Sequence, residues 1–221
     1  MSILFVLLMF LLIMSISYFC QPHAAQSEFK PQAVIAPQTP RLKREFGFEI
    51  PEGYGFHPGH LWAHKESHDD ARVGADKFLT NLMGKIDRVE ICGVNRWVRQ
   101  GQKLITLHSD GTSVDLLSPV EGVVMGINND AFQNPALIMQ DPYNRGWIAM
   151  VKSPDLTINQ KNLVQGSMVA PWMQNNVSRL NGMLSKLSPA MAQDGGQPIS
   201  GLLPRLAADV RQKVVTEFFL S

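Results

Sequence analysis

The chain has 221 residues, of which 45% are hydrophobic and 18% charged, so it can hold one domain of ordinary size with attached segments. Its 20 Lys and Arg against 19 Asp and Glu give a formal net charge of +1. With neither a strong positive field nor a basic run carrying interleaved aromatic residues, we expect no nucleic-acid partner. The two cysteines, Cys20 and Cys92, belong to no CxxC pair, and we expect both to be free thiols.

The first segment is strongly apolar. Residues 3–19 read ILFVLLMFLLIMSISYF and contain no charged side chain, and about 20 such residues span a bilayer as a helix. A cleavable signal peptide would begin with Lys or Arg and end at small residues, but no Lys or Arg precedes Lys30, and the best cleavage candidate, residues 23–25, is poor. We therefore predict an uncleaved, single-pass transmembrane helix within residues 1–20.

The charges that flank this segment predict its orientation. Lys30, Arg41, Lys43 and Arg44 follow it, whereas only the N-terminal amine precedes it. Because basic residues concentrate on the cytoplasmic side of membrane spans, we expect the body of the protein in the cytoplasm, with a periplasmic body as the alternative.

The rest of the chain divides into segments that differ in composition and hydrophobic pattern. Residues 21–53 contain several prolines and no amphipathic period, which predicts an extended linker. From residue 54 to about 151, short β-rich runs alternate with glycines and turn pairs, as in a small sandwich or barrel. The runs are HLWAHKE, ARVGA, KIDRVEIC, KLITLHS, SVDLLSPV, GVVMGIN and WIAMVKS.

Helical segments follow the β-rich region. Residues 157–187 predict a short helix and a longer one, with Pro171 in the first turn of the second. Residues 188–201 predict a flexible break, and residues 203–219 a last, amphipathic helix. The stripe of that helix either covers the domain's own surface or grips a partner or membrane interface. Its members are Leu203, Leu206, Val210, Val214 and Phe218.

Two neighbouring segments carry a half-motif of lipoyl-type domains. Residues 94–109 lead through a Gln-Gly-Gln turn at 100–102 into one strand, and residues 114–124 leave by a bend with the sequence Ser-Pro-Val-Glu-Gly. Proline fixes φ and glycine permits tight geometry in such a bend. Biotin carriers and efflux-pump adaptors share this half-motif, so it indicates a barrel-sandwich hybrid without choosing among these classes.

Three further sequence motifs point to one family among these classes. They are His-Leu-Trp at 60–62, the segment 128–138 with its Asn-Pro-Ala-Leu-Ile end, and Asp-Pro-Tyr-Asn-Arg-Gly-Trp at 141–147. In this order they resemble the H protein of the glycine cleavage system. The resemblance covers residues 54–187 and implies a mainly β fold, a lipoyl-like barrel-sandwich hybrid followed by C-terminal α-helices.

The position that bears lipoate in this family differs. The resemblance implies a lysine at the hairpin tip, whereas here the tip residues are Ser109, Asp110, Gly111 and Thr112. Asp-Gly is a favoured two-residue hairpin turn, because both of its positions favour positive φ. Along the sequence, the nearest lysine is Lys103, at the start of the incoming strand. We expect no lipoate and no other cofactor.

Histidines suggest a metal site only weakly. His57, His60, His64 and His68 lie within HPGHLWAHKESH, and a helix would line up the last three as ligands. The alternation predicts a strand, which would separate His60 from His64 by about 13 Å on one face. His57 and His60 remain weak candidates for capturing a metal, and the other reading makes all four surface or strand histidines.

Catalytic groups are not indicated. His108, Ser109 and Asp110 are adjacent, but neighbouring residues of a strand point to opposite faces and cannot form a triad relay. We therefore expect a non-enzymatic protein, an H-like module without lipoate that serves as a membrane-anchored scaffold. Two alternatives stay open: a lipoyl carrier with a displaced modification site, and a periplasmic export-pump adaptor. Protein partners could bind through the helix at 203–219.

Overall fold

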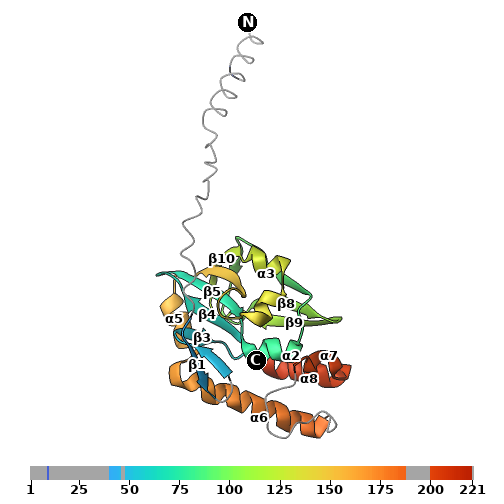
Figure 1. Ribbon diagram of the computed structural model, residues 1–221. Helices are drawn as coiled ribbons and strands as arrows, with labels where there is room; N and C mark the ends of the chain where they lie inside the picture. The colour runs from blue at the N-terminus through green and yellow to red at the C-terminus, as the bar shows by residue number, and fades with distance from the viewer. Residues whose placement is uncertain (1–8, 10–39, 46–47, 188–199, 221) are drawn as a thin grey trace. The chain divides into compact units, whose positions relative to one another are not determined.

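The computed structural model describes Met9 and residues 40–45, 48–187 and 200–220 (Figure 1). The chain divides into two units, residues 1–37 and 38–221, and the fold described below belongs to the second. The predicted transmembrane helix in residues 1–20 lies outside the described residues, apart from Met9. Among the helices that are described, none combines the length and apolarity needed to cross a bilayer.

The second unit is mainly β with α-helices towards its C-terminal end, as predicted. The strands are β1 Leu42–Glu45, β2 Phe48–Pro51, β3 Tyr54–Phe56, β4 Leu61–Lys65, β5 Asp70–Ala75, β6 Arg88–Ile91, β7 Trp97–Val98, β8 Lys103–Ser109, β9 Thr112–Leu117, β10 Gly122–Ile127, β11 Trp147–Lys152 and β12 Val164–Gln165. The helices are α2 Lys77–Met83, α3 Asn129–Gln133, α4 Ala136–Gln140, α5 Leu156–Lys161, a 3-10 turn at Gly166–Met168, α6 Val169–Leu187, α7 Leu202–Arg205 and α8 Ala208–Phe219.

Three sheets build this unit. A seven-stranded sheet has the order β12-β3-β4-β5-β11-β10-β7, a three-stranded sheet the order β6-β8-β9, and β1 pairs with β2. The strand pairs with a resolved register are antiparallel, and β10 and β11 slip register by a bulge between Val124 and Gly126. One continuous core of buried apolar side chains joins the sheets to the helices. The second unit is therefore a mainly β domain with a layer of helices, as the barrel-sandwich prediction requires.

Close packing between β4 and β5 explains one glycine of the sequence. The Trp62 indole is fully buried and lies over Gly74, where an added Cβ would come within 2.4 Å of the ring. The Trp62 Nε1–H donates to the Ala75 carbonyl at 2.9 Å, so the buried ring leaves no polar atom unpaired. Only glycine at position 74 leaves room for this ring.

The predicted linker 21–53 is too long at its C-terminal end. Strands β1 and β2 occupy part of it, and Phe48 and Ile50 of β2 belong to the core. Burial of these two side chains, in part against α6, favours a strand over an extended tether. The local sequence did not reveal this strand because its partner helix lies more than a hundred residues away.

The C-terminal segment also differs from its prediction. Instead of one helix over 203–219, α7 ends at Arg205 and α8 begins at Ala208, because Leu206 and Ala207 are extended. The predicted apolar stripe is buried within the domain, where α8 packs on β9 and α6 and α7 packs on α2. The structure therefore agrees with the first of the two readings, in which the stripe covers the domain's own core.

The string at 141–147 has the architectural role expected of it. The Asp141 carbonyl accepts the Gly146 N–H at 2.7 Å and its carboxylate accepts the Arg145 N–H at 3.2 Å, which closes the turn before β11. Tyr143 is buried, and its carbonyl accepts the Tyr54 hydroxyl at 2.6 Å. Burial raises the pKa of Tyr54 to about 12, so this phenol stays a donor at neutral pH.

We expect Gly122→Ala to lower the free energy of unfolding by more than about 2 kcal/mol. Gly122 has φ +151, and an added Cβ would lie 2.1 Å from the Lys152 carbonyl oxygen. The matched control on the same strand is Gly126→Ala, where nothing lies within 4 Å, and its effect should stay below about 1 kcal/mol. Urea unfolding of both variants gives the comparison, and equal losses would contradict the close approach at position 122.

Candidate functional site

The β8–β9 hairpin closes through a two-residue turn at the predicted position. Ser109 pairs with Thr112, while Asp110 and Gly111 between them have φ of +44 and +72. Positive φ at both central positions is the mark of a type I′ turn, whose twist matches that of the flanking strands. The structure thus brings together the four predicted tip residues, with Asp110 and Gly111 exposed and Ser109 and Thr112 buried.

A lysine that sequence reasoning missed lies beside this tip. Lys85 Nζ is 2.7 Å from Asp87 Oδ1, and Asp87 Oδ2 accepts the Asp110 N–H at 2.8 Å. Lys85 precedes β6, which pairs with β8 so that Arg88 stands opposite His108. The signal that could have found it is this strand register, which places residues just before β6 next to the turn.

The environment of Lys85 keeps its amine charged. Its hydrogen bond with the Asp87 carboxylate, and then the charges of Asp87 and Asp110, raise the pKa of Lys85. A protonated amine has no lone pair to attack an acyl donor. Lys103, the lysine considered from the sequence, lies at the opposite end of β8 and forms an ion pair with Asp115 at 2.7 Å.

The apparent triad at 108–110 is not assembled. His108 lies on the outer face of the β6-β8-β9 sheet, 3.4 Å from Glu90. The Ser109 hydroxyl donates in the other direction, to the Met83 carbonyl at 3.5 Å. These residues therefore point to opposite faces, as the strand geometry predicts.

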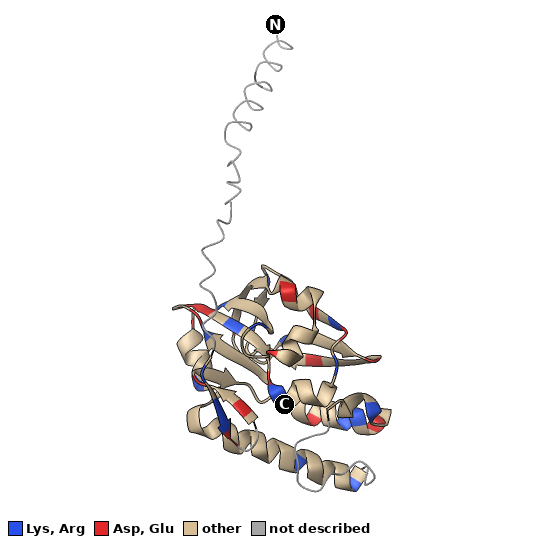
Figure 2. Cartoon of the chain, viewed as in Figure 1, with Lys and Arg blue, Asp and Glu red and all other residues tan. Residues whose placement is uncertain are grey.

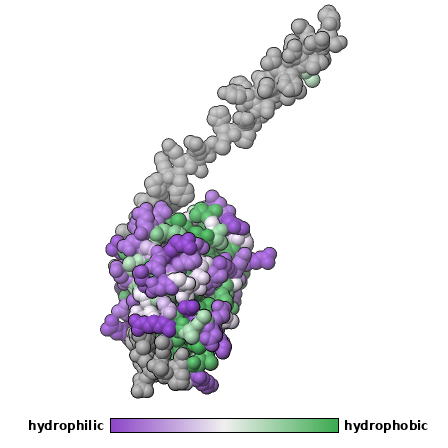
Figure 3. Space-filling model, turned by 90° about the vertical axis from the view of Figure 1, so that its right-hand side faces the viewer, coloured by the Kyte–Doolittle hydropathy of each residue, from purple (hydrophilic) through white to green (hydrophobic). Residues whose placement is uncertain are grey.

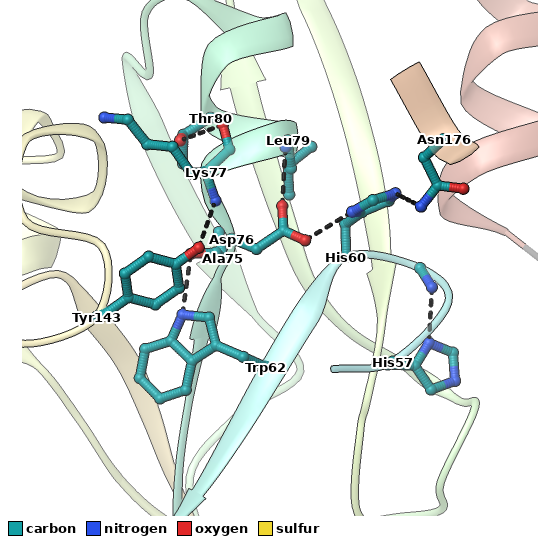
Figure 4. Close-up of polar contacts among 11 residues, drawn as sticks. His57, His60, Trp62, Ala75, Asp76, Lys77, Leu79, Thr80, Tyr143 and Asn176 are labelled. Atoms are coloured by element: carbon teal, nitrogen blue, oxygen red, sulfur yellow. Dashed lines mark hydrogen bonds and ion pairs between the residues drawn. The ribbon is translucent and has the colours of Figure 1, made fainter. Parts of the chain in front are cut away.

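A row of buried, hydrogen-bonded side chains lies at the start of β4 (Figure 4). His60 Nδ1 is 2.6 Å from Asp76 Oδ2, and Asp76 Oδ1 accepts the Leu79 N–H at 2.9 Å as the N-cap of α2. On the other side of the ring, Asn176 Nδ2 of α6 is 3.3 Å from His60 Nε2. With the Asp76 carboxylate as acceptor on one side and the Asn176 amide as donor on the other, a ring proton of His60 lies on Nδ1.

These buried hydrogen bonds correct the expectation for His60. The residue is neither on a strand nor on the surface: it has φ +65 in the β3–β4 turn and is fully buried. Its ring stacks between Phe78, with centroids 4.3 Å apart, and Trp172, at 4.9 Å. Three chain segments meet at this imidazole, which gives it a role in holding the fold together.

His57, the other weak metal candidate, is also engaged. Its Nδ1 accepts the Gly59 N–H at 2.9 Å, which closes the turn that carries His60. Burial, and secondarily the charge of His60, lower the pKa of His57 to about 4, so the ring stays neutral and keeps accepting this bond. Within the described part of the chain, no three His, Cys, Asp or Glu side chains gather as a metal site.

We expect Asp76→Ala to cost about 2–4 kcal/mol of unfolding free energy, because it removes the α2 cap and leaves the His60 donor buried without an acceptor. Asp76→Asn is the matched variant: its amide oxygen can still cap α2, and a change of His60 tautomer can restore the second bond. Chemical unfolding should therefore rank wild type, Asp76→Asn and Asp76→Ala in that order. An alanine variant as stable as the wild type would show that the hydrogen bonds of Asp76 contribute nothing to stability.

The family model described as "Glycine cleavage H-protein" matches residues 55–176, more than half of the chain. Among curated proteins, the glycine cleavage system H protein of Xanthomonas axonopodis pv. citri is 34% identical over 107 residues, which is 48% of this chain and 82% of the relative. The H protein of Thermus thermophilus is 32% identical over 108 residues, 49% of this chain and 84% of the relative.

Among solved structures, a glycine cleavage system H protein from Mycobacterium marinum superposes with a TM-score of 0.48 at 23% identity, covering 57% of this chain and 98% of that chain. The family match includes the buried cluster of His60 and Asp76 as well as the β8–β9 hairpin, and it ends at Asn176. On the family model and these relatives, the chain belongs to the glycine cleavage H-protein family.

Proposed function

We propose that this protein is an H-like interaction module that carries no lipoate and is anchored in a membrane by residues 3–19. The observation that carries the proposal is the hairpin tip. The family resemblance implies a carrier lysine there, whereas Asp110 and Gly111 form a complete type I′ turn between the paired residues Ser109 and Thr112. Without a primary amine at the tip, the module keeps the family's scaffold but not its attachment point.

Localisation is part of the same proposal. The uncharged residues 3–19 and the later basic residues support a single-pass anchor with the body in the cytoplasm. An anchor would confine the module to a membrane surface, where it can bring a partner protein to a fixed place. A protein of this kind acts by binding and needs no catalytic residue of its own.

A second candidate, a lipoyl carrier with a displaced site, is favoured by one observation. Lys85 lies beside the tip, linked to Asp110 through Asp87. A ligase that reaches the tip of the hairpin could also meet this exposed amine. The Lys85 amine is held in an ion pair with Asp87 and stands before β6, not on the hairpin turn, so we place this candidate second.

We expect the intact mass of the purified full chain to show no lipoyl increment, even after incubation with a lipoate ligase, lipoate and ATP. Under the same conditions, Gly111→Lys should gain one lipoyl group, because position 111 is exposed and nothing lies within 4 Å of an added Cβ; its φ of +72 strains the turn but leaves the amine at the tip. The control is Gly126→Lys, which adds a lysine on β10 away from the tip and should stay unmodified. A lipoyl group on the wild type would overturn the proposal, and its loss in Lys85→Arg would establish the second candidate.

Membrane attachment gives a separate expected result. The full chain should sediment with membranes and resist extraction by alkaline carbonate, whereas a chain lacking residues 1–20 should stay in the supernatant. A fluorescent reporter at the C-terminus that matures only in the cytoplasm tests the side. Full-length protein in the carbonate supernatant would refute the anchor, and a dark reporter in membrane-bound protein would favour the periplasmic alternative.

A further inference from the structure

A groove lies between α6 and α8, two helices that contact each other at the C-terminal end of the domain. It consists of hollows of about 490 Å³ and about 360 Å³ that share Met183 and Glu217 as lining residues. On the side of the molecule where α7 and α8 lie, Figure 3 shows hydrophobic residues beside hydrophilic ones. We call this feature the α6–α8 groove; its central residues are Arg179, Gly182, Met183, Lys186, Lys213 and Phe218.

The lining of the groove is apolar in the middle and basic around it. Met183, which is half-buried, and Leu187 at the end of α6, which is 37% exposed, supply the hydrophobic surface, while the Phe218 ring is buried. Methionine is flexible and polarisable, so it adapts to the shape of an inserted side chain. At Gly182, nothing lies within 4 Å of the position of an added Cβ, which leaves the wall of the groove open there.

Most of the charged side chains described in the lining of the groove are basic. Among the described residues of the lining, the one that is acidic, Glu217, is paired with Arg179, whose guanidinium also lies over the Phe218 ring at 5.3 Å from its centroid. Lys186 and Lys213 form no ion pair within the described residues. Figure 2 shows the blue of Lys and Arg on α6 and on the α7–α8 region. The groove therefore offers uncompensated positive charge beside apolar surface.

The α6–α8 groove lies at the C-terminal end of the family match. That match ends at Asn176 inside α6, and the described lining residues follow it. The apolar stripe of α8 packs into the core, as Val214 and Phe218 are buried. Helix α8 thus covers the core with one face and lines the groove with another.

We propose that the α6–α8 groove binds a short acidic, amphipathic segment of a partner protein, whose apolar side chains enter the hollows while its carboxylates meet Lys186 and Lys213. This deepens the proposed function, on which it rests, by naming where and what the interaction module binds. Helix-in-groove recognition uses this combination of an apolar floor and charges at the edge. A concave groove favours a protein segment over a flat lipid surface, which would touch the rim but not fill the hollows.

Photo-crosslinking in cells that express the full chain tests the proposal. A benzophenone amino acid replaces Gly182 in the groove, and in two control chains it replaces Gly111 at the hairpin tip or Ile158 on α5, which is 60% exposed. Each crosslinked product is digested and sequenced. We expect a crosslink from position 182 to one partner segment with a net negative charge and apolar residues at helical spacing, and none to that segment from position 158.

Binding of a synthetic copy of the crosslinked segment then tests the charges. The double variant Lys186→Glu, Lys213→Glu should raise its Kd at least about tenfold and remove most of its salt dependence. The control Lys65→Glu, Lys161→Glu changes two exposed lysines outside the lining and should leave the Kd unchanged.

The other outcomes overturn the inference in distinguishable ways. A crosslink from position 182 to lipid, to a basic segment or to residues 188–199 of the same chain would show that the groove serves another occupant. A partner captured only from position 111 or 158 would refute the groove but leave the interaction module standing. No partner from any of the three positions would count against both.

Discussion

The carboxylate of Asp76 joins three segments of the chain at the centre of the domain. It follows β5, caps the N-terminus of α2 and binds His60 in the β3–β4 turn. Through His60 it reaches Asn176, so the sheet and the long helix α6 are tied to one buried charge. Because a buried carboxylate without partners costs several kcal/mol, any rearrangement of these three segments would have to satisfy it again. That constraint fixes the position of the helical layer against the sheets.

Aromatic packing around the same imidazole extends this constraint to the end of the domain. The His60 ring lies between Phe78 and Trp172, and Phe219 of α8 approaches its edge with centroids 5.7 Å apart. The backbone fits closely there as well, since an added Cβ on Gly59 would lie 2.9 Å from the Phe219 carbonyl oxygen. The groove between α6 and α8 therefore has walls that are positioned by the core and not by the partner.

Features governed by neighbours in the sequence could be predicted. Short β-rich runs between glycines and turn pairs predicted β4 to β6 and β8 to β11, and the Asp110–Gly111 pair predicted the hairpin turn. Features governed by distant contacts could not. Strand β2 depends on burial against α6, and the positive φ of His60 depends on Asp76 and Asn176.

In the candidate site, too, local features could be predicted and distant contacts could not. The lack of a lysine at the tip is evident from residues 109–112 alone, whereas the approach of Lys85 requires the register between β6 and β8. Likewise, the stripe of the last helix was visible, but its burial against β9 and the break at Leu206 depend on the shape of the core that it covers. A groove built from α6 and α8 has no signature in either helix taken separately.

The contact between α8 and the start of the domain sets when the core can close during synthesis. His60 near the beginning and Phe219 near the end share one packed cluster, so the core cannot close until about 160 further residues have been made. At elongation rates of about 5–20 residues per second, this takes roughly 10–30 s. During that interval the faces of Phe78 and β9 that α8 will cover are open to solvent. The cluster around His60 is therefore among the last parts of the domain to be completed as the chain is made.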